Sequence, residues 1–225
     1  KLAIPNTVIN IGKGAFYECG GLRDIAVPNS VKNLGSRAFE NCDALAKVSI
    51  SDSVTSMGEK AFYDCDALTD VELGTGITQI PTSCFEHCDA LPSVVLPYRV
   101  SKVGDNAFKN CVALTEITIP RATTSISTSA FSYPAKMTVY GISGTYAETF
   151  ANQQGMKFVD KAVRATNVVL DKTELTLNRG MKYSLTMTVT PATFTDEVSW
   201  KSTNVNVAAI AEDGTVTGKE AGQAT

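Results

Sequence analysis

The chain has 225 residues, of which 44% are hydrophobic and 19% are charged, and its 20 Lys and Arg against 23 Asp and Glu give a net charge of −3. This composition is typical of a globular protein and excludes a disordered one, while the mild acidity disfavours a nucleic-acid partner, which needs a basic surface. Apolar runs nowhere approach the roughly 18–20 residues of a membrane helix, and a single His and a single Trp leave little room for histidine-based catalysis.

Residues 1–134 are dominated by an internal repeat of 23 residues. Phe recurs at this interval from Phe16 to Phe131, and Cys recurs at the same interval from Cys19 to Cys111. One unit reads L-x-x-I-x-I-P-x-S-V-x-x-I-G-x-x-A-F-x-x-C-x-x. Such self-similarity is typical of a solenoid, in which each unit forms one coil that buries its apolar side only by stacking on its neighbours.

The physical chemistry of one unit predicts its path. In L-x-x-I-x-I the last two apolar residues are two positions apart, so they point to one face of a short strand. Pro cannot donate to a ladder and ends that strand. V-x-x-I predicts a second short extended piece, Gly turns the chain, and A-F-x-x-C predicts a tight helical or 3-10 turn with Phe and Cys facing inward.

With its A-F-x-x-C segment, the unit resembles the leucine-rich repeats of bacterial BspA-like surface proteins, over about residues 1–134. The resemblance implies a leucine-rich-repeat solenoid that is rich in β-structure, with short helical or 3-10 turns. It also implies a protein that is secreted or held on the bacterial cell surface.

Residues 135–160 are expected to cap the solenoid. Residues 137–140 read as one more strand, and Thr145 with Glu148 three residues later forms a capping box that predicts a short helix. Tyr146, Ala147, Phe150 and Ala151 would give this helix an apolar face, Gly155 suits its C-terminal end, and residues 156–159 would close as a strand. We therefore expect a first domain over residues 1–160.

Residues 161–225 have a different pattern, with apolar residues that alternate with period two and turn signals such as Asp213-Gly214. Short alternating strands predict a β-sandwich. The string from Thr166 through Ser199-Trp200-Lys201-Ser202 to Gly218 resembles a Big2-type bacterial immunoglobulin-like domain. That family continues with at least one more strand, so we expect a partial domain with a frayed C-terminal edge. The alternating residues are Val168/Leu170, Leu175/Leu177, Tyr183/Leu185/Met187/Val189 and Val198/Trp200.

Five of the six cysteines occupy one column of the repeat. Stacked Cβ atoms about 4.8 Å apart with parallel directions do not suit a disulfide, which needs converging Cβ atoms about 3.5–4.5 Å apart. We therefore expect reduced, buried thiols, although one or two bridges remain an alternative.

A C-x-x-H-C string over residues 84–88 could supply three zinc ligands. The repeat offers a simpler explanation, because Cys88 is the column position and Cys84 takes the place of Ala in the other units. His87 falls where the neighbouring units carry Asn or Asp, which predicts a solvent-facing side chain. We expect no metal, no cofactor and no catalytic residue.

The outward positions of the long strands form the candidate binding surface. Asp24, Asp70, Glu72 and Glu116 make this face acidic, and Lys47 interrupts it. The alternative is an ordinary solvated sheet face, since none of the expected positions is Trp, Tyr or Arg, the residues that dominate interface hot spots. Tyr17, Tyr63, Tyr98 and Arg99 lie in turns and could rim another surface. The expected pairs are Asp24/Ala26, Lys47/Ser49, Asp70/Glu72, Ser93/Val95, Glu116/Thr118 and Lys136/Thr138.

Together these patterns and resemblances predict a monomeric, non-enzymatic interaction protein of adhesin type. Its solenoid would bind a host or microbial protein, and the immunoglobulin-like domain would act as a spacer. Two alternatives remain open: a module that binds carbohydrate or cell wall, and a targeting module of a larger surface enzyme. We expect no nucleic-acid partner and no membrane insertion within this segment.

Overall fold

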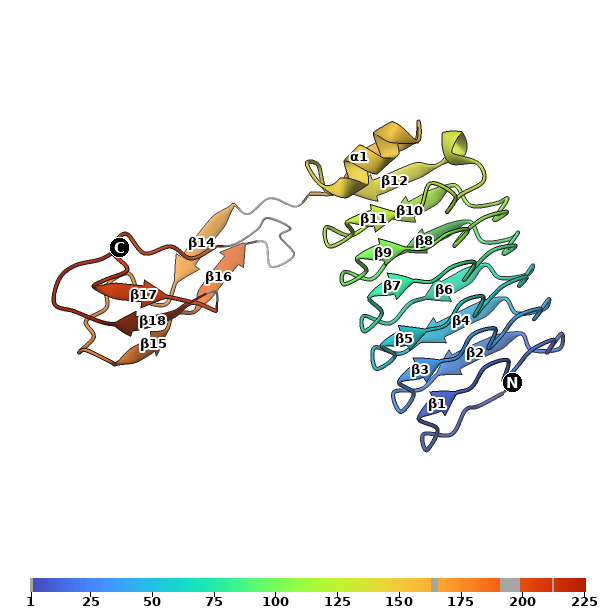
Figure 1. Ribbon diagram of the computed structural model, residues 1–225, viewed down its shortest axis with the longest axis horizontal. Coiled ribbons are helices and arrows are strands. Elements are labelled where there is room, and N and C mark those ends of the chain that lie inside the picture. Colours follow the sequence, from blue (N-terminus) through green and yellow to red (C-terminus); the bar gives the residue numbers. More distant parts are fainter. Residues whose placement is uncertain (1, 163–165, 191–198, 212) are drawn as a thin grey trace. The chain divides into compact units, whose positions relative to one another are not determined.

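The computed structural model describes residues 2–162, 166–190, 199–211 and 213–225 (Figure 1). The chain divides into two compact units, residues 1–161 and 162–225. The first is the predicted β-rich solenoid with little helix, and the second consists of small antiparallel sheets consistent with an immunoglobulin-like domain.

One side of the solenoid is built from the longer strands, which pair in parallel as β2–β4–β6 and as β8–β10–β12–β13. Side chains alternate across a strand, so the inward residues are apolar and the outward residues are mostly polar, with exceptions such as Ala26 and the exposed Val95. In Lys47–Ile50, for example, Lys47 and Ser49 are exposed or half-buried, whereas Val48 and Ile50 are buried. These strands are β2 (Asp24–Val27), β4 (Lys47–Ile50), β6 (Asp70–Glu72), β8 (Ser93–Val95), β10 (Glu116–Thr118), β12 (Thr138–Gly141) and β13 (Lys157–Asp160).

A second side is built from two-residue strands that pair as β1–β3–β5 and as β7–β9–β11. In each, the second residue is buried. Gly follows four of these strands, and Pro81 and Ser127 follow the other two. At Gly58 the adjacent coils approach too closely for a side chain, because a Cβ there would lie 2.3 Å from the backbone nitrogen of Ser36. The strands are β1 (Asn10–Ile11), β3 (Asn33–Leu34), β5 (Ser56–Met57), β7 (Gln79–Ile80), β9 (Lys102–Val103) and β11 (Ser125–Ile126).

The A-F-x-x-C segments form the third side, which we call the Phe-turn edge. Their internal hydrogen bonds are of the 3-10 type, as from the Tyr63 amide to the Lys60 carbonyl (3.2 Å). They do not continue as a helix because two positions in each of the turns from Phe16 to Phe108 have positive φ, as at Lys60 (57°) and Asp64 (57°). The amides of one turn donate instead to the next coil, as from Phe62 to the Cys84 carbonyl (2.9 Å).

The core is a set of columns running through the coils. The Phe rings stack nearly parallel, with centroids 5.2 Å apart for Phe39–Phe62 and 5.4 Å apart for Phe62–Phe85. Their offset stacking adds to the apolar area they bury. All six cysteines are free, as their spacing predicts, and all but Cys19 are fully buried.

The cap closes the C-terminal end of the solenoid with a 3-10 turn (Pro134–Lys136), strand β12, helix α1 (Tyr146–Gln153) and strand β13. The buried face of α1 consists of Ala147, Phe150 and Ala151. The ring centroid of Phe150 lies 6.1 Å from that of Phe131, the last ring of the Phe column. The helix begins where it is predicted, but neither bond of the predicted capping box forms. The Thr145 hydroxyl donates to the Ile142 carbonyl (2.6 Å), and Glu148 accepts from the Gly144 amide (2.7 Å) instead of the Thr145 amide.

The second unit contains the pairs β14–β16 and β15–β18–β17, all antiparallel. Asp213-Gly214 forms the predicted turn, and Gly214 (φ +81°) lies so close to Trp200 that a Cβ there would be 3.0 Å from the ring. Leu175, Leu177 and Trp200 lie outside strands, and Val198 lies outside the described residues. The strands are β14 (Asn167–Leu170), β15 (Lys182–Ser184), β16 (Met187–Thr190), β17 (Ala208–Ile210) and β18 (Thr215–Gly218).

The expected frayed C-terminus is wrong, because Thr225 is paired. Its amide donates to the Thr203 hydroxyl (2.8 Å), and its carbonyl accepts from the Thr203 amide (2.7 Å).

Candidate functional site

The outward side chains of the long strands form the face that is predicted from sequence as the candidate binding surface. We call it the strand face. Within each sheet, parallel pairing places equivalent residues directly beside one another, as Asp24, Lys47 and Asp70 are placed on β2, β4 and β6. Asp24, Lys47, Asp70, Glu72 and Glu116 are all exposed.

Lys47 joins the acidic residues at the N-terminal part of this face. Its Nζ lies 2.7 Å from Asp70 Oδ2 and 3.3 Å from Glu72 Oε1. These two hydrogen bonds raise the pKa of Lys47, so the ammonium stays charged. Because all three side chains are about half exposed, solvent screens the pairs and they add little to stability. They hold two carboxylates in fixed positions on the surface.

The expected pair Lys136/Thr138 at the C-terminal part of the face is wrong by register. Glu116 pairs with Thr138 and Thr118 pairs with Tyr140, because the last unit is one residue shorter than the others. Lys136 lies in the 3-10 turn instead, with its ammonium 5.7 Å from the Tyr133 ring.

The corrected register gives the strand face an aromatic residue, Tyr140. Its hydroxyl donates to Glu116 Oε1 (3.2 Å), and the Lys161 ammonium lies 4.6 Å from the centre of its ring. Partial burial and the nearby Glu116 raise the pKa of Tyr140, so the phenol stays protonated at neutral pH. The strand face therefore holds Lys47 with its two carboxylates at one end and Tyr140 with Glu116 at the other.

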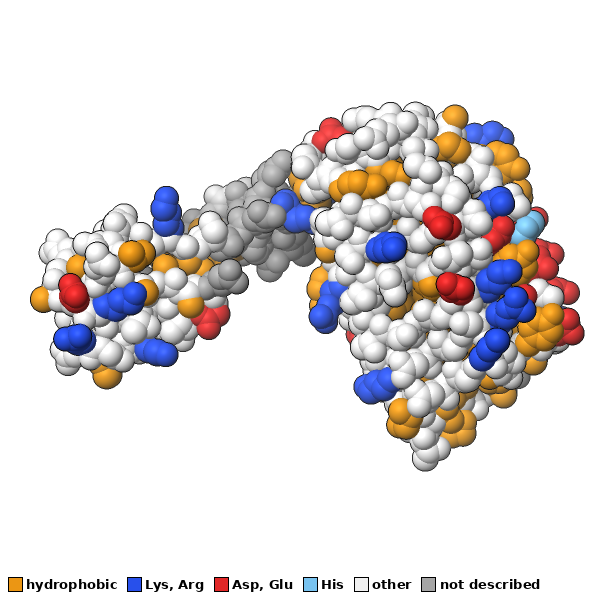
Figure 2. Space-filling view, viewed as in Figure 1, with side chains coloured by type: hydrophobic (Ala, Val, Ile, Leu, Met, Phe, Trp, Pro, Cys, Tyr) orange, Lys and Arg blue, Asp and Glu red, His pale blue; other side chains and the backbone are white. Residues whose placement is uncertain are grey.

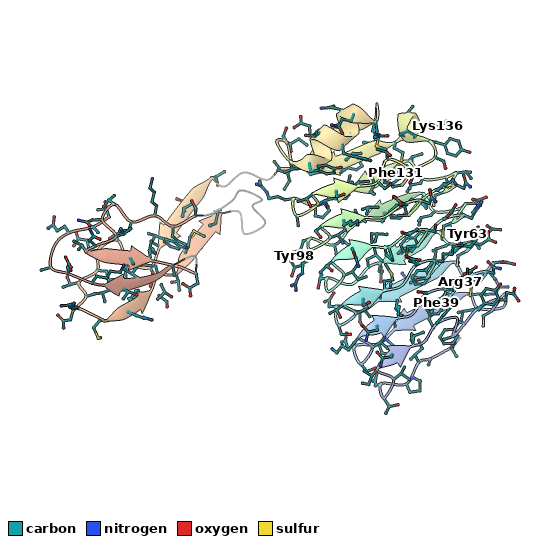
Figure 3. The ribbon with its side chains drawn as sticks, viewed as in Figure 1. Arg37, Phe39, Tyr63, Tyr98, Phe131 and Lys136 are labelled. Carbon is teal, nitrogen blue, oxygen red and sulfur yellow. The ribbon has the colours of Figure 1, made fainter. Side chains whose placement is uncertain are left out.

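The Phe-turn edge carries further aromatic and basic side chains. Figure 3 shows Arg37, Tyr63 and Lys136 along this edge and Tyr98 on the opposite edge of the solenoid. The Lys60 ammonium lies 4.6 Å from the Tyr63 ring centre, and Arg37 Nε lies 3.4 Å from Glu40 Oε2. In Figure 2 basic and acidic side chains gather together toward this edge, whereas the middle of the visible face is mostly uncharged.

The C-x-x-H-C string does not bring its side chains together. Cys84 and Cys88 are fully buried in the core, whereas the His87 ring packs edge-on against Tyr63 and its Nε2 lies 3.1 Å from Asn110 Nδ2. Burial raises the pKa values of both thiols. In the parts of the chain that the structure describes, three or more His, Cys, Asp or Glu side chains nowhere converge as a metal site would require.

Two hollows on the solenoid are shallow and open to solvent. One, of about 740 Å³, lies over the short strands and is lined by hydroxyl and backbone groups together with Glu59, Lys102 and Asp105. The other, of about 590 Å³, is lined by Leu2, Phe16 and Leu22 among others. Neither hollow contains the His87 ring.

Both units match known protein families. The BspA type leucine rich repeat region matches residues 9–138 in six copies, and the bacterial Ig-like domain (group 2) matches residues 164–225. Both types of domain are typically non-catalytic. Among curated proteins nothing matches the chain.

Solved structures of similar repeat proteins are bacterial. A leucine rich cell surface protein from Faecalibacterium prausnitzii is 37% identical, with a TM-score of 0.53, over 57% of this chain and 34% of its own. A leucine-rich repeat protein from Bacteroides ovatus is 26% identical, with a TM-score of 0.54, over 70% of this chain and 46% of its own. A leucine rich repeat protein from T. pallidum is 26% identical, with a TM-score of 0.53, over 58% of this chain and 62% of its own.

The chain thus spans about a third of the F. prausnitzii protein, 34%. Of the helices in the described residues, none has the length and apolar content needed to cross a bilayer. The repeat columns, the parallel coils and the match over residues 9–138 agree, and the chain belongs to the BspA-type leucine-rich-repeat family, followed by a group 2 bacterial immunoglobulin-like domain.

Proposed function

We propose that this chain is a non-enzymatic interaction protein of adhesin type, secreted or displayed on the bacterial cell surface. The strand face would bind a host or microbial protein, and the immunoglobulin-like domain would act as a spacer. The cell-surface placement rests on the family and on the description of the F. prausnitzii relative as a cell surface protein.

The observation that carries the proposal is the extended, polar strand face with its fixed charges and Tyr140. Solenoids bind macromolecules through extended faces of this kind, and Tyr is one of the residues enriched in interface hot spots. The carboxylates of Asp24, Asp70, Glu72 and Glu116 favour a partner with a complementary basic surface.

A catalytic role finds no support in the chemistry of the groups that could act. The five buried cysteines are core residues, and burial raises the pKa of Cys42 to about 11, which keeps its thiol protonated. A nucleophile needs an adjacent base, and His87 is hydrogen-bonded to Asn110 on the surface. The shallow hollows do not exclude water, which electrostatic catalysis requires.

The test is a binding screen of the purified chain on immobilised host matrix proteins and bacterial surface proteins, beside a glycan array. For a protein that binds, the double variant Asp70→Lys/Glu116→Lys should weaken binding at least tenfold, because it reverses two charges on the face. The matched control is Glu59→Lys/Asp105→Lys, which reverses two exposed carboxylates beside the short strands and should change affinity less than twofold.

Binding to glycans without binding to any protein would replace this proposal with a carbohydrate-binding function. Equal losses in the face variant and the control variant would show that the strand face is not the binding surface.

A further inference from the structure

Both parallel ladders of the solenoid are interrupted at the same level. Within residues 2–162, all of which the structure describes, β5 does not pair with β7 and β6 does not pair with β8, although every other adjacent pair of long or short strands is paired. A plane through these two gaps leaves residues 2–72, with β1 to β6, on one side. Residues 79–161, with β7 to β13 and the cap, lie on the other.

The long-strand gap has a covalent cause at Pro92. At the same position in other coils, the amides of Ala46, Thr69 and Thr115 donate to the preceding coil. The Thr69 amide donates to the Ala46 carbonyl (3.0 Å), and the Thr115 amide donates to the Pro92 carbonyl (3.0 Å). Proline has no N–H, so the equivalent bond from residue 92 to the Thr69 carbonyl, just before β6, cannot form.

The short-strand gap has the same cause at Pro81. Four other coils have Gly here and one has Ser127. The amides of Gly35, Gly58 and Gly104 donate to the preceding coil at 2.8, 2.9 and 2.8 Å. The Gly58 amide, for example, donates to the Leu34 carbonyl. A single coil thus carries the two prolines that remove donors from both ladders, one on each side of its Phe turn.

Side-chain burial agrees with the missing pairs. Val71 and Leu73, the inward residues of the β6 segment, are only partly buried. In the neighbouring coils the residues equivalent to Val71 are Val48 and Val94, which are 0% and 2% exposed. The interface between β6 and β8 therefore also buries less apolar surface than the other interfaces between long strands.

The chain crosses the gap through residues 73–78, which contain Gly74 and Gly76. Four other coils have Pro at the position of Gly74, namely Pro5, Pro28, Pro97 and Pro120. Gly has the greatest backbone freedom and Pro the least. The one connection that must bend if the two parts move thus has more intrinsic backbone freedom than its Pro-containing counterparts, although Gly74 and Gly76 lie close to the carbonyls of Ser51 and Asp52.

Contacts across the gap persist at the Phe-turn edge. The amides of Lys60, Phe62 and Asp64 donate to the carbonyls of the next coil at 3.1, 2.9 and 2.9 Å. The Phe62 and Phe85 rings remain stacked at 5.4 Å, and the Cys88 thiol donates to the Phe62 carbonyl (3.2 Å). One of the three sides of the coil is therefore still joined.

We propose that the solenoid consists of two cooperative blocks, residues 2–72 and 79–161, that open relative to each other about the Phe-turn edge. In a repeat protein the coupling between neighbouring repeats sets how far unfolding and motion spread, and this interface has lost its two ladders. The hinge does not depend on the proposed binding role. It does divide the candidate face, with Lys47, Asp70 and Glu72 on one block and Glu116 and Tyr140 on the other.

Hydrogen exchange of the full chain, measured by mass spectrometry, tests this hinge. In the wild-type protein the amides of β2 to β6 should exchange as one group, at least tenfold faster than those of β8 to β13, because only the second block has the cap. The variants Pro92→Thr and Pro81→Gly place the residues of the neighbouring coils at the gap and restore the donors. Each should slow exchange in residues 2–72 by roughly fivefold, and the double variant by about 30-fold, the factors expected for one and two net hydrogen bonds.

The control variant is Pro120→Ser, which introduces an N–H at a position where Ser51 and Gly74 donate to no backbone carbonyl among the described residues. It should leave the exchange pattern unchanged. The reverse variant Thr115→Pro should create a second gap between β8 and β10, so that amides up to β8 join the fast group. The Thr115→Pro variant therefore still tests the hinge if the double variant does not fold. Equal exchange rates in the two blocks, unchanged by Pro92→Thr, Pro81→Gly and Thr115→Pro, would overturn the hinge.

Discussion

The thiol of Cys88 donates a hydrogen bond to the carbonyl oxygen of Phe62, 3.2 Å away in the preceding coil. The same bond joins Cys65 to Phe39 at 3.2 Å and Cys111 to Phe85 at 3.0 Å. A cysteine therefore does two things in this column: it packs as a small apolar residue and supplies a weak donor to a buried carbonyl. Ala would fill part of the space but leave the carbonyl with one partner fewer.

The first prediction concerns thiol reactivity. Burial raises the pKa of Cys42 to about 11, and it raises the pKa values of Cys65, Cys84 and Cys88. Because the thiolate is the reactive form, these thiols should react very slowly with a disulfide reagent at pH 8. Only the partly exposed Cys19 should react quickly in the native protein.

Titration of the denatured protein without prior reduction provides the count. All six thiols should then react, since the sequence contains six Cys. Two or fewer reactive thiols after denaturation would mean that disulfides replace the column.

A second prediction concerns the Phe column. Phe85 is fully buried and stacks on Phe62 at 5.4 Å and on Phe108 at 5.4 Å. Phe85→Ala should destabilise the solenoid by about 3–5 kcal/mol, because it leaves a cavity in the core. Chemical denaturation followed by far-UV circular dichroism measures this loss. The exposed Tyr98→Ala should change stability by less than about 0.5 kcal/mol, and equal effects of the two variants would contradict the stacked core.

The periodic parts of the fold could be predicted from sequence because each coil repeats the same physical constraints. Phe16 and its equivalents at 23-residue steps have to face one interior, and the strand alternation follows from the apolar residues around Val48. The positive φ values at the Phe-turn edge were not predicted. Their signal is the recurrence of Asn and Asp at Asn41, Asp64 and Asn110, residue types that tolerate a left-handed backbone.

What sequence reasoning missed lies where the repeat departs from its period. The last unit is one residue shorter, so Thr138 lies beside Glu116 and Tyr140 lies beside Thr118. The expected pair Lys136/Thr138 was placed two residues too early along the chain. Neither Pro81 nor Pro92 conflicts with the chain path that the repeat predicts for a single coil. Their effect depends on a bond to the neighbouring coil, which a comparison of donors at equivalent positions would have revealed.

The third prediction separates a backbone role of His87 from a metal-binding role. His87 has φ +62°, in the column that contains Asn41 and Asn110. Asn tolerates this conformation, so His87→Asn should change stability by less than about 0.5 kcal/mol. A β-branched residue is strained there, and His87→Val should destabilise the solenoid by about 1–3 kcal/mol.

Thermal unfolding with and without added zinc provides the second measurement. Wild type and His87→Asn should show the same melting temperature in both conditions. A zinc-dependent rise in the wild type that disappears in His87→Asn would instead assign a metal-binding role to the C-x-x-H-C string.

A fourth prediction concerns the acid sensitivity of the immunoglobulin-like unit. Asp171 follows β14 and accepts hydrogen bonds from the Tyr183 hydroxyl (2.7 Å) and the Thr186 amide (2.9 Å). The bond from Tyr183, followed by that from Thr186, lowers the pKa of Asp171. A carboxyl whose pKa is lower in the folded state than in the unfolded state stabilises the folded state at pH values above its unfolded pKa, about 3.9. This stabilisation is lost as the pH falls through the folded value.

Trp200 is the single Trp of the chain and lies in this unit, so its fluorescence during urea unfolding reports the unit separately from the solenoid. The urea midpoint of the wild type should fall as the pH decreases from about 5 to 3, the range in which an unfolded carboxyl titrates. Asp171→Asn should lower the midpoint at pH 7 and flatten its decline in acid. Tyr183→Phe should produce part of the same change, because it removes one of the two donors while the Thr186 amide remains. If Asp171→Asn retains the full pH dependence of the wild type, the acid sensitivity comes from another carboxyl, and Asp213, whose pKa is lowered by the Thr215 amide, becomes the residue to substitute.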